Sequence, residues 1–117
     1  MRKIKTLKKN YQFRKTLTKG KYYKGQVIDI YIRQNKQIDN YIGIAVSVKV
    51  GKAVKRNHIK RLIRENYKQI KDKLEKGYDI VFLWKKQKSF SEATYDTIKK
   101  DEETIFKKAE LLKEVEK

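Results

Sequence analysis

The amino-acid sequence predicts an α+β fold, an α/β sandwich in which helices pack on a single small sheet in the order α-β-β-α-β-α. Three observations carry this prediction: two segments alternate apolar and polar residues, one later segment is continuously apolar, and three segments repeat apolar residues at helical spacing. The chain has 117 residues and no proline, cysteine, repeat or linker. We therefore expect one domain over residues 1–117, stabilised by packing alone.

Residues 9–20 predict a short first helix. Phe13 and Leu17 lie four residues apart on one side, Asn10 can cap the start, and Gly20 can end the helix. Residues 26–34 then alternate strictly, with three isoleucines on one side, and predict a half-buried strand. Polar residues 35–40 predict a hairpin-like connection into a second strand over residues 41–48.

One side of that second strand is nearly bare. Gly43, Ala45 and Ser47 share it, and small residues weaken a strand unless something must approach closely. This pattern predicts a shallow trough flanked by the rings of Tyr31 and Tyr41. The alternative is that a helix packs there.

Two elements complete the fold. Residues 78–84 form a short apolar run without alternation, which predicts a central strand covered on both faces. From Ser89 or Thr94 onward, apolar residues recur near helical period and predict a long final helix, for which Ser89 and Glu92 can form a capping box.

The charge of the chain indicates its partner. The net charge is +18, and residues 1–88 hold 26 lysines and arginines against six acids, whereas residues 89–117 hold six against eight. Because such self-repulsion opposes folding unless a partner neutralises it, we expect this chain to bind a polyanion.

The strongest concentration of charge is residues 49–68, with eight lysines and arginines in twenty positions. At helical period, Ile59, Leu62 and Ile63 gather on one side. The opposite side collects Asn57, Lys60, Arg61, Arg64, Lys68 and Lys71. This cationic side spans about 21 Å, long enough to follow several phosphates. Lys49, Gly51 and Lys52 precede it, where a phosphate would meet the positive end of the helix dipole.

No pattern for catalysis is present in the sequence. The chain has one histidine, His58, no cysteine, and no carboxylates at metal-ligand spacing, and "GKAVKRN" lacks the order of a P-loop. We expect neither catalytic residues nor a metal site in the protein.

These residues resemble a known family. The segment "GIAVSVKVGKAVKRNHIKRLIREN" resembles the signature of the protein subunit of bacterial ribonuclease P, and "LKKNYQFRKTLTKG", "YDIVFLWKK" and "TYDTIKK" extend the likeness over about 90 residues. The resemblance implies a small basic partner of a catalytic RNA that removes the 5′ leader of precursor tRNA. It also implies a left-handed βαβ crossover around the basic helix.

The resemblance, joined to the charge pattern, gives two sets of expected contacts. Those to the RNA subunit are Lys49, Lys52, Arg56, Asn57, His58, Lys60, Arg61, Arg64 and Lys68. Those to the precursor-tRNA leader are Phe13, Leu17, Tyr31, Tyr41 and Ser47. Two positions depart from the family: Leu17 stands where an aromatic residue is common, and His58 where arginine is usual. Mg²⁺ is expected on the RNA subunit, with one protein monomer per RNA.

Two other classes of protein share part of this pattern. A small ribosomal protein would have the same size and charge without a leader-binding trough, and a helix-turn-helix DNA-binding protein would pair its recognition helix with a second helix. No apolar run approaches the roughly 20 residues that cross a bilayer, so we expect a cytoplasmic protein without a membrane partner.

Overall fold

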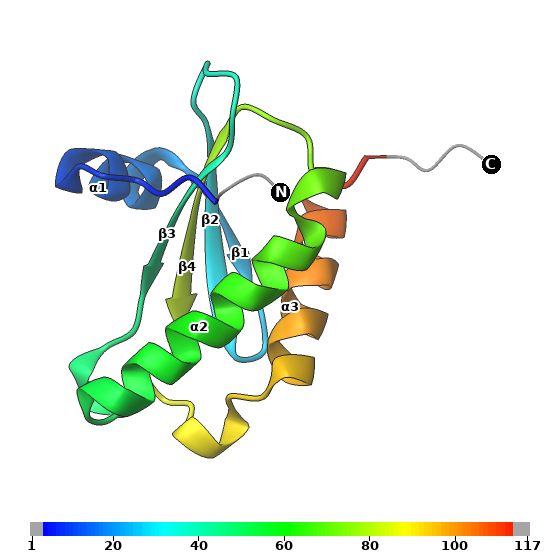
Figure 1. Ribbon diagram of the computed structural model, residues 1–117. Helices are drawn as coiled ribbons and strands as arrows, with labels where there is room; N and C mark the ends of the chain where they lie inside the picture. Colours follow the sequence, from blue (N-terminus) through cyan, green and yellow to red (C-terminus); the bar gives the residue numbers. More distant parts are fainter. Residues whose placement is uncertain (1–3, 114–117) are drawn as a thin grey trace.

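One four-stranded sheet organises the part of the chain that the computed structural model describes, residues 4–113 (Figure 1). The ends of the expected domain, residues 1–3 and 114–117, lie outside it. The strands are β1 (Lys21–Lys24), β2 (Ile28–Gln34), β3 (Tyr41–Ala45) and β4 (Tyr78–Trp84). Their order across the sheet is β1-β2-β4-β3, so β2 and β4 lie inside and β1 and β3 lie at the edges.

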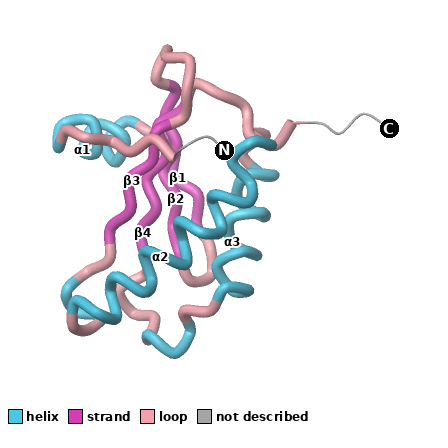
Figure 2. Tube along the Cα trace, in the orientation of Figure 1, coloured by secondary structure: helices cyan, strands magenta, loops and turns pink. Residues whose placement is uncertain are grey.

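Helices cover both faces of this sheet. They are α1 (Asn10–Lys19), α2 (Ala53–Ile70) and α3 (Tyr95–Lys108), with short 3₁₀ turns at Val48–Val50, Lys71–Lys73 and Phe90–Glu92. Figure 2 shows α2 and α3 side by side along the sheet, with α1 apart from them. The α+β prediction is confirmed, and the predicted order of elements holds once β1 is added.

Strand β1 was not predicted. Its four residues, "KYYK", lie between Gly20 and Gly25 and have neither the length nor the alternation that identifies a strand. It pairs antiparallel with β2, which fixes Tyr22 opposite Tyr31.

The prediction of a hairpin-like connection between β2 and β3 is wrong. β4 lies between these strands, antiparallel to β2 and parallel to β3, as expected of a central strand. Helix α2 therefore connects two parallel neighbours, β3 and β4. In Figure 1, with α2 toward the viewer, both strands run downward and β4 lies to the right of β3, so the crossover is left-handed, as the resemblance implied.

The core lies between the sheet and the pair α2 and α3. From the sheet it takes alternate residues that share one face, among them Ile30, Ile80 and Phe82. Helix α2 adds Ile59 and Ile63, the apolar side that the sequence predicted. We call this the first face of the sheet; the opposite one, which carries Tyr31 and Gly43, is the second face.

Helix boundaries differ slightly from the predictions. Lys9 rather than Asn10 is the N-cap of α1, because the Gln12 side chain accepts a hydrogen bond from the Lys9 backbone N–H, while Gly20 ends the helix as expected. Ser89 and Glu92 form their capping box around a 3₁₀ turn, and α3 itself begins after Thr94, whose hydroxyl accepts from the Thr97 N–H. Within residues 4–113, no helix is long and apolar enough to cross a membrane.

Two acids of α3 are buried. The Asp101 carboxylate accepts hydrogen bonds from the backbone N–H groups of Gln26, Val27 and Ile28 at 3.0, 2.7 and 3.0 Å, which fastens the entry to β2 onto α3. The side chain of its neighbour Glu102 is 1 % exposed and, among the described residues, both of its oxygens lack a hydrogen-bond partner.

Candidate nucleic-acid interface

The outer side of α2 is a cationic surface. Ile59, Leu62 and Ile63 pack toward the sheet, so the polar residues between them point outward. Asn57, Arg61, Arg64 and Lys68 are exposed and Lys60 is half-buried. The one acid near them, Glu65, lies 3.6 Å from Arg61 across one helical turn. An exposed pair of this kind is weak and leaves Arg61 available to a phosphate.

Lys71 does not belong to this surface. The helical wheel placed it among the outward cations, but α2 ends at Ile70 and the chain tightens into a 3₁₀ turn. The segment before α1 and the loop between β2 and β3 lie beside Lys71 and cover it, so it is only 7 % exposed.

The chain that leads into α2 is also suited to an anion. Lys49 and Lys52 are exposed, and Gly51 adopts φ 152°, a conformation that side chains disfavour. Lys52 is the N-cap but offers no side-chain hydrogen bond, and the first turn of α2 has no acid. Its first backbone N–H groups thus have no side-chain acceptor from the cap, which favours a negatively charged partner.

His58 and Arg56 lie at the edge of the cationic surface, half-buried. The His58 ring is 5.5 Å from the ring of Phe90, and the Lys55 ammonium lies 5.4 Å from the same ring. The 3₁₀ turn at Phe90–Glu92 therefore braces the first half of α2. Arg56 Nε is buried and has no hydrogen-bond partner among the described residues.

The second face of the sheet is partly covered by α1. A Cβ atom added to Gly43 would lie 2.7 Å from the Phe13 ring, so the glycine is required for this close approach. The small residues of β3 predicted either an open trough or a packed helix, and each holds in part. A helix packs at Gly43, while the rest of the face stays open. Leu17 lies one turn beyond Phe13 on the same side of α1 and is half-buried.

The open part of this face contains a hollow of about 400 Å³ beyond α1. Ala45, Ser47, Leu83 and Lys86 contribute to its lining. The Ser47 hydroxyl also accepts a hydrogen bond from the Lys49 N–H at 3.2 Å. The hollow and the start of α2 are therefore joined by one short stretch of chain, residues 46–52.

Aromatic rings lie along the same face. Tyr31 on β2 and Tyr41 on β3 are both half-buried there, with β4 between their strands. Tyr22 on β1 packs against Tyr31 with ring centroids 5.1 Å apart and is 47 % exposed. Sequence reasoning missed Tyr22 because its strand was not recognised; its pairing with Tyr31 extends the aromatic surface that unpaired bases can stack on.

The acids of the second face are neutralised by cations. Asp29 lies 2.7 Å from the Lys85 ammonium, and Asp79 lies 3.7 Å from Arg33. The Asn35 side chain also donates to Asp79 at 2.9 Å. Each carboxylate has a partner within the protein, so this face does not oppose a polyanion.

Groups that could hold a metal ion are not assembled in the described chain, since no three His, Asp or Glu side chains gather within residues 4–113. The structure brings the expected RNA contacts together on two surfaces instead. The RNA-subunit set lies on α2 and the segment before it, and the leader set lies on the second face around α1.

The fold and these surfaces define a small, strongly basic α+β protein with a cationic helix in a left-handed crossover. The family model of ribonuclease P matches residues 1–110. The chain belongs to the family of the ribonuclease P protein component, part of a ribonucleoprotein that processes tRNA.

Individual relatives agree over nearly the whole chain. The ribonuclease P protein component of Clostridioides difficile is 40 % identical over 110 residues, which cover 93 % of this chain and 95 % of that protein. The RNase P protein of Staphylococcus aureus superposes with a TM-score of 0.81 at 32 % identity, covering 94 % of this chain and 99 % of that one. The RNase P protein of Thermotoga maritima gives 0.78 at 27 % identity, over 89 % and 96 %. Family membership favours this identity over the ribosomal and DNA-binding alternatives.

Proposed function

We propose that this chain binds two RNAs at once: the RNA subunit of ribonuclease P along the outer side of α2, and the 5′ leader of precursor tRNA on the second face. The observation that carries the proposal is the placement of these surfaces. The cationic residues of α2 point away from the first face, whereas the rings of Tyr22 and Tyr31 and the hollow at Ser47 lie on the second. Two RNAs can therefore occupy the protein without competing.

The chemistry of the two surfaces supports this division. Arginine and lysine along a helix suit a folded RNA whose phosphates are closely spaced. Aromatic side chains on an open sheet suit a single strand, because every base has a face that can stack. The leader is single-stranded, so the second face fits the leader.

Cleavage itself is assigned to the RNA subunit, with Mg²⁺ bound mainly by RNA phosphates. The protein would stabilise the assembly electrostatically and lengthen its contact with the substrate. One protein monomer would serve one RNA subunit, in the cytoplasm, where the expected substrates are. Its role is therefore that of a non-catalytic component of an endoribonuclease.

The test separates the two surfaces with one substitution in each. Tyr31→Ala should weaken binding of precursor tRNA by roughly 1 to 3 kcal/mol, the range for one lost stacking contact, and leave binding of mature tRNA and of the RNA subunit unchanged. Arg64→Ala should weaken binding of the RNA subunit and reduce the slope of log affinity against log salt by roughly 0.7 to 0.9.

Matched controls are available on α3. Tyr95→Ala removes an exposed ring far from the second face, and Lys108→Ala removes an exposed cation away from α2. Both should behave as the unaltered chain in fluorescence titrations with each RNA. Equal losses for precursor and mature tRNA with Tyr31→Ala, in a variant with an unaltered circular dichroism spectrum, would contradict the leader assignment. An unchanged salt slope with Arg64→Ala would contradict the α2 assignment.

A further inference from the structure

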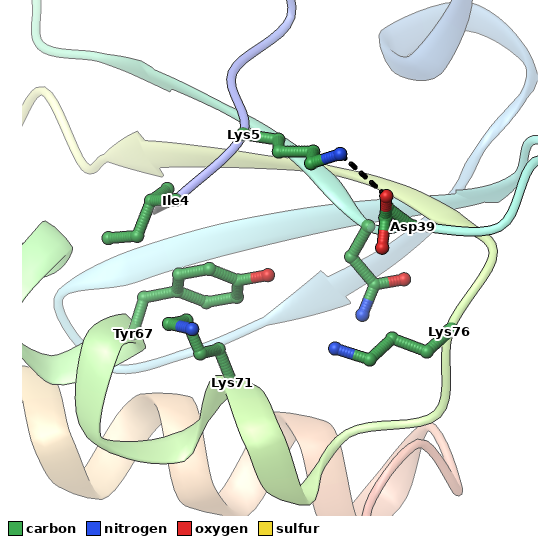
Figure 3. A pocket seen from close by; sticks show the side chains of 7 residues that line it. Ile4, Lys5, Asp39, Tyr67, Lys71 and Lys76 are labelled. Atoms are coloured by element: carbon green, nitrogen blue, oxygen red, sulfur yellow. Dashed lines mark hydrogen bonds and ion pairs between the residues drawn. The ribbon is translucent and has the colours of Figure 1, made fainter. Parts of the chain in front are cut away.

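A pocket at the far end of α2 is separate from both proposed RNA surfaces. It has a volume of about 380 Å³ and lies between the segment before α1, the loop from β2 to β3, and the 3₁₀ turn after α2. Its lining comprises Ile4, Lys5, Asp39, Asn40, Tyr67, Lys71 and Lys76. In Figure 3 Tyr67 and Lys71 lie together on one wall, the Lys76 side chain reaches in from the opposite wall, and the pair of Lys5 and Asp39 forms the rim.

The walls of the pocket are held in place by hydrogen bonds. The Asn40 amide donates to the Glu75 carbonyl at 2.8 Å, and its oxygen accepts from the Tyr78 N–H at 2.9 Å, which fixes the loop that carries Lys76. Backbone bonds of 2.9 Å from Leu7 to Ile42 and from Ile42 to Lys5 fasten the segment before α1 to the edge of β3. The pocket is thus a formed part of the fold.

Lys71 supplies the observation that points to a ligand. Its side chain is 8 % exposed, yet the carboxylate paired with it, that of Asp72, lies 3.4 Å away on a side chain that is 74 % exposed. A buried ammonium normally requires a close counter-charge, because removing it from water costs several kcal/mol. An exposed aspartate at this distance offsets that cost only in part, so the pocket favours an anion beside Lys71.

Tyr67 and Lys76 also present hydrogen-bond donors to the pocket. Burial, and then the nearby Glu102 carboxyl, raise the pKa of the Tyr67 hydroxyl well above its ordinary value, so this hydroxyl keeps its proton and can donate it in a hydrogen bond. Lys76 is exposed on the opposite wall. The sole acid in the lining, Asp39, lies 2.7 Å from the Lys5 ammonium.

The charge of the lining matches a dianion. Three lysines and Asp39 in the lining leave two positive charges, of which Asp72, on the exposed side of Lys71, offsets a part. A phosphate monoester carries about 1.5 to 2 negative charges at pH 7, whereas an internal phosphodiester of RNA carries one. The volume also exceeds that of a phosphate group and is in the range of pockets for small organic ligands, roughly 300 to 1,000 Å³.

We propose that this pocket binds a terminal phosphate monoester carried on a nucleoside, with Lys71, Lys76 and the Tyr67 hydroxyl as its donors. Such a group can come from a free nucleoside monophosphate or from the 5′-phosphorylated end of an RNA chain. The proposal does not depend on the leader or RNA-subunit assignments, since it uses different residues.

The test uses the full chain and four probes: AMP, cyclic AMP, and a short oligoribonucleotide with and without a 5′ phosphate. NMR titration locates each binding event, because shifts at Lys71, Lys76 and Tyr67 are distinct from shifts on the outer side of α2. AMP should saturate the pocket and bind roughly tenfold more tightly than cyclic AMP, which has the same nucleoside but one charge. Tighter binding of the 5′-phosphorylated oligonucleotide than of AMP at these residues assigns the RNA end as the source, and the reverse order assigns the free nucleotide.

Substitutions test whether AMP binds in this pocket. Lys76→Met, at an exposed position that tolerates change, and Lys71→Met, which keeps the buried stem, should each weaken AMP binding roughly tenfold or more. Lys108→Met removes a charge elsewhere and should leave the affinity within roughly twofold. The proposal is overturned if AMP shifts appear only on α2, if AMP and cyclic AMP bind equally, or if folded Lys76→Met binds AMP as the unaltered chain does.

Discussion

Glu102 on α3 makes the stability of this protein depend on pH in an unusual direction. Its carboxyl is buried between α3 and the core, and within residues 4–113 neither oxygen has a hydrogen-bond partner. Burial, followed by the negative charges of Asp101 and Glu103, raises the pKa of Glu102 well above its ordinary value. Tyr67 on α2 also faces this carboxyl and is neutral. The folded protein therefore keeps a proton on Glu102 that the unfolded chain loses.

The sign of the effect follows from counting protons. Below the pKa of an unfolded glutamate, about 4.3, both states carry the proton and the contribution of Glu102 to stability is fully present. Above it the unfolded state binds one proton fewer, so the free energy of unfolding falls with pH, by about 1.4 kcal/mol per unit at most. This loss continues until pH passes the raised pKa of the folded state.

The perturbation is Glu102→Gln, which keeps the size of the side chain and removes its titration. Relative to this variant, the unaltered chain should lose stability as pH rises above about 4.3, with a slope of at most about 1.4 kcal/mol per unit until pH passes the raised pKa of the folded state. Glu102→Leu should additionally remove two buried oxygens without partners, a gain of roughly 1 to 3 kcal/mol at pH 7.

Urea unfolding measures these differences, followed by fluorescence of Trp84, the sole tryptophan, which is 3 % exposed. Comparing variants at each pH cancels the titration of all other groups. Glu110→Gln, an exposed change whose charge is not among those that raise the pKa of Glu102, is the matched control and should follow the unaltered chain. Parallel stability curves for the unaltered chain and Glu102→Gln between pH 5 and 7 would refute the reasoning.

Two further substitutions test other contacts. Asp101→Ala leaves three backbone N–H groups without their acceptor, and those of Val27 and Ile28 are buried. Because each buried N–H group without a partner costs roughly 1 to 3 kcal/mol, urea unfolding should show a loss of about 2 kcal/mol or more, against a small effect of Asp96→Ala. A loss under about 1 kcal/mol would mean that water replaces the carboxylate. His58→Arg places a permanent charge at the edge of the cationic surface and should steepen the salt dependence of RNA-subunit binding by roughly 0.7; an unchanged slope would place position 58 outside that interface.

Local patterns were sufficient for most elements of the fold. The continuous apolar run at 78–84 identified β4 as central because burial on both faces leaves no polar alternation. The spacing of Ile59 and Ile63 identified the inward side of α2, since a helix repeats every 3.6 residues. Both signals lie within a few neighbouring residues.

Features that depend on distant residues could not be predicted this way. β4 lies between β2 and β3 because it pairs with residues more than 30 positions away in the sequence. The alternation of residues within a strand does not show which strand it pairs with. Gly43 signalled a close approach but not its partner, Phe13. Likewise, nothing in the sequence near Asp101 shows that the backbone at Gln26 lies against it. The burial of Lys71 arises from distant segments, those of Lys5 and Asn40, which a helical wheel of α2 alone does not contain.

The backbone bonds that fasten Lys5 and Leu7 to β3 also affect self-association. β3 is an edge strand, and an open edge presents unpaired N–H and C=O groups that can recruit a strand from another copy. The segment before α1 occupies this edge at Ile42, while the opposite edge, β1, carries Lys21 and Lys24, whose charges discourage pairing. A chain shortened to begin at α1 would expose the β3 edge and acquire a tendency to aggregate, so expression designs should retain residues 4–9 even where the RNA surfaces alone are of interest.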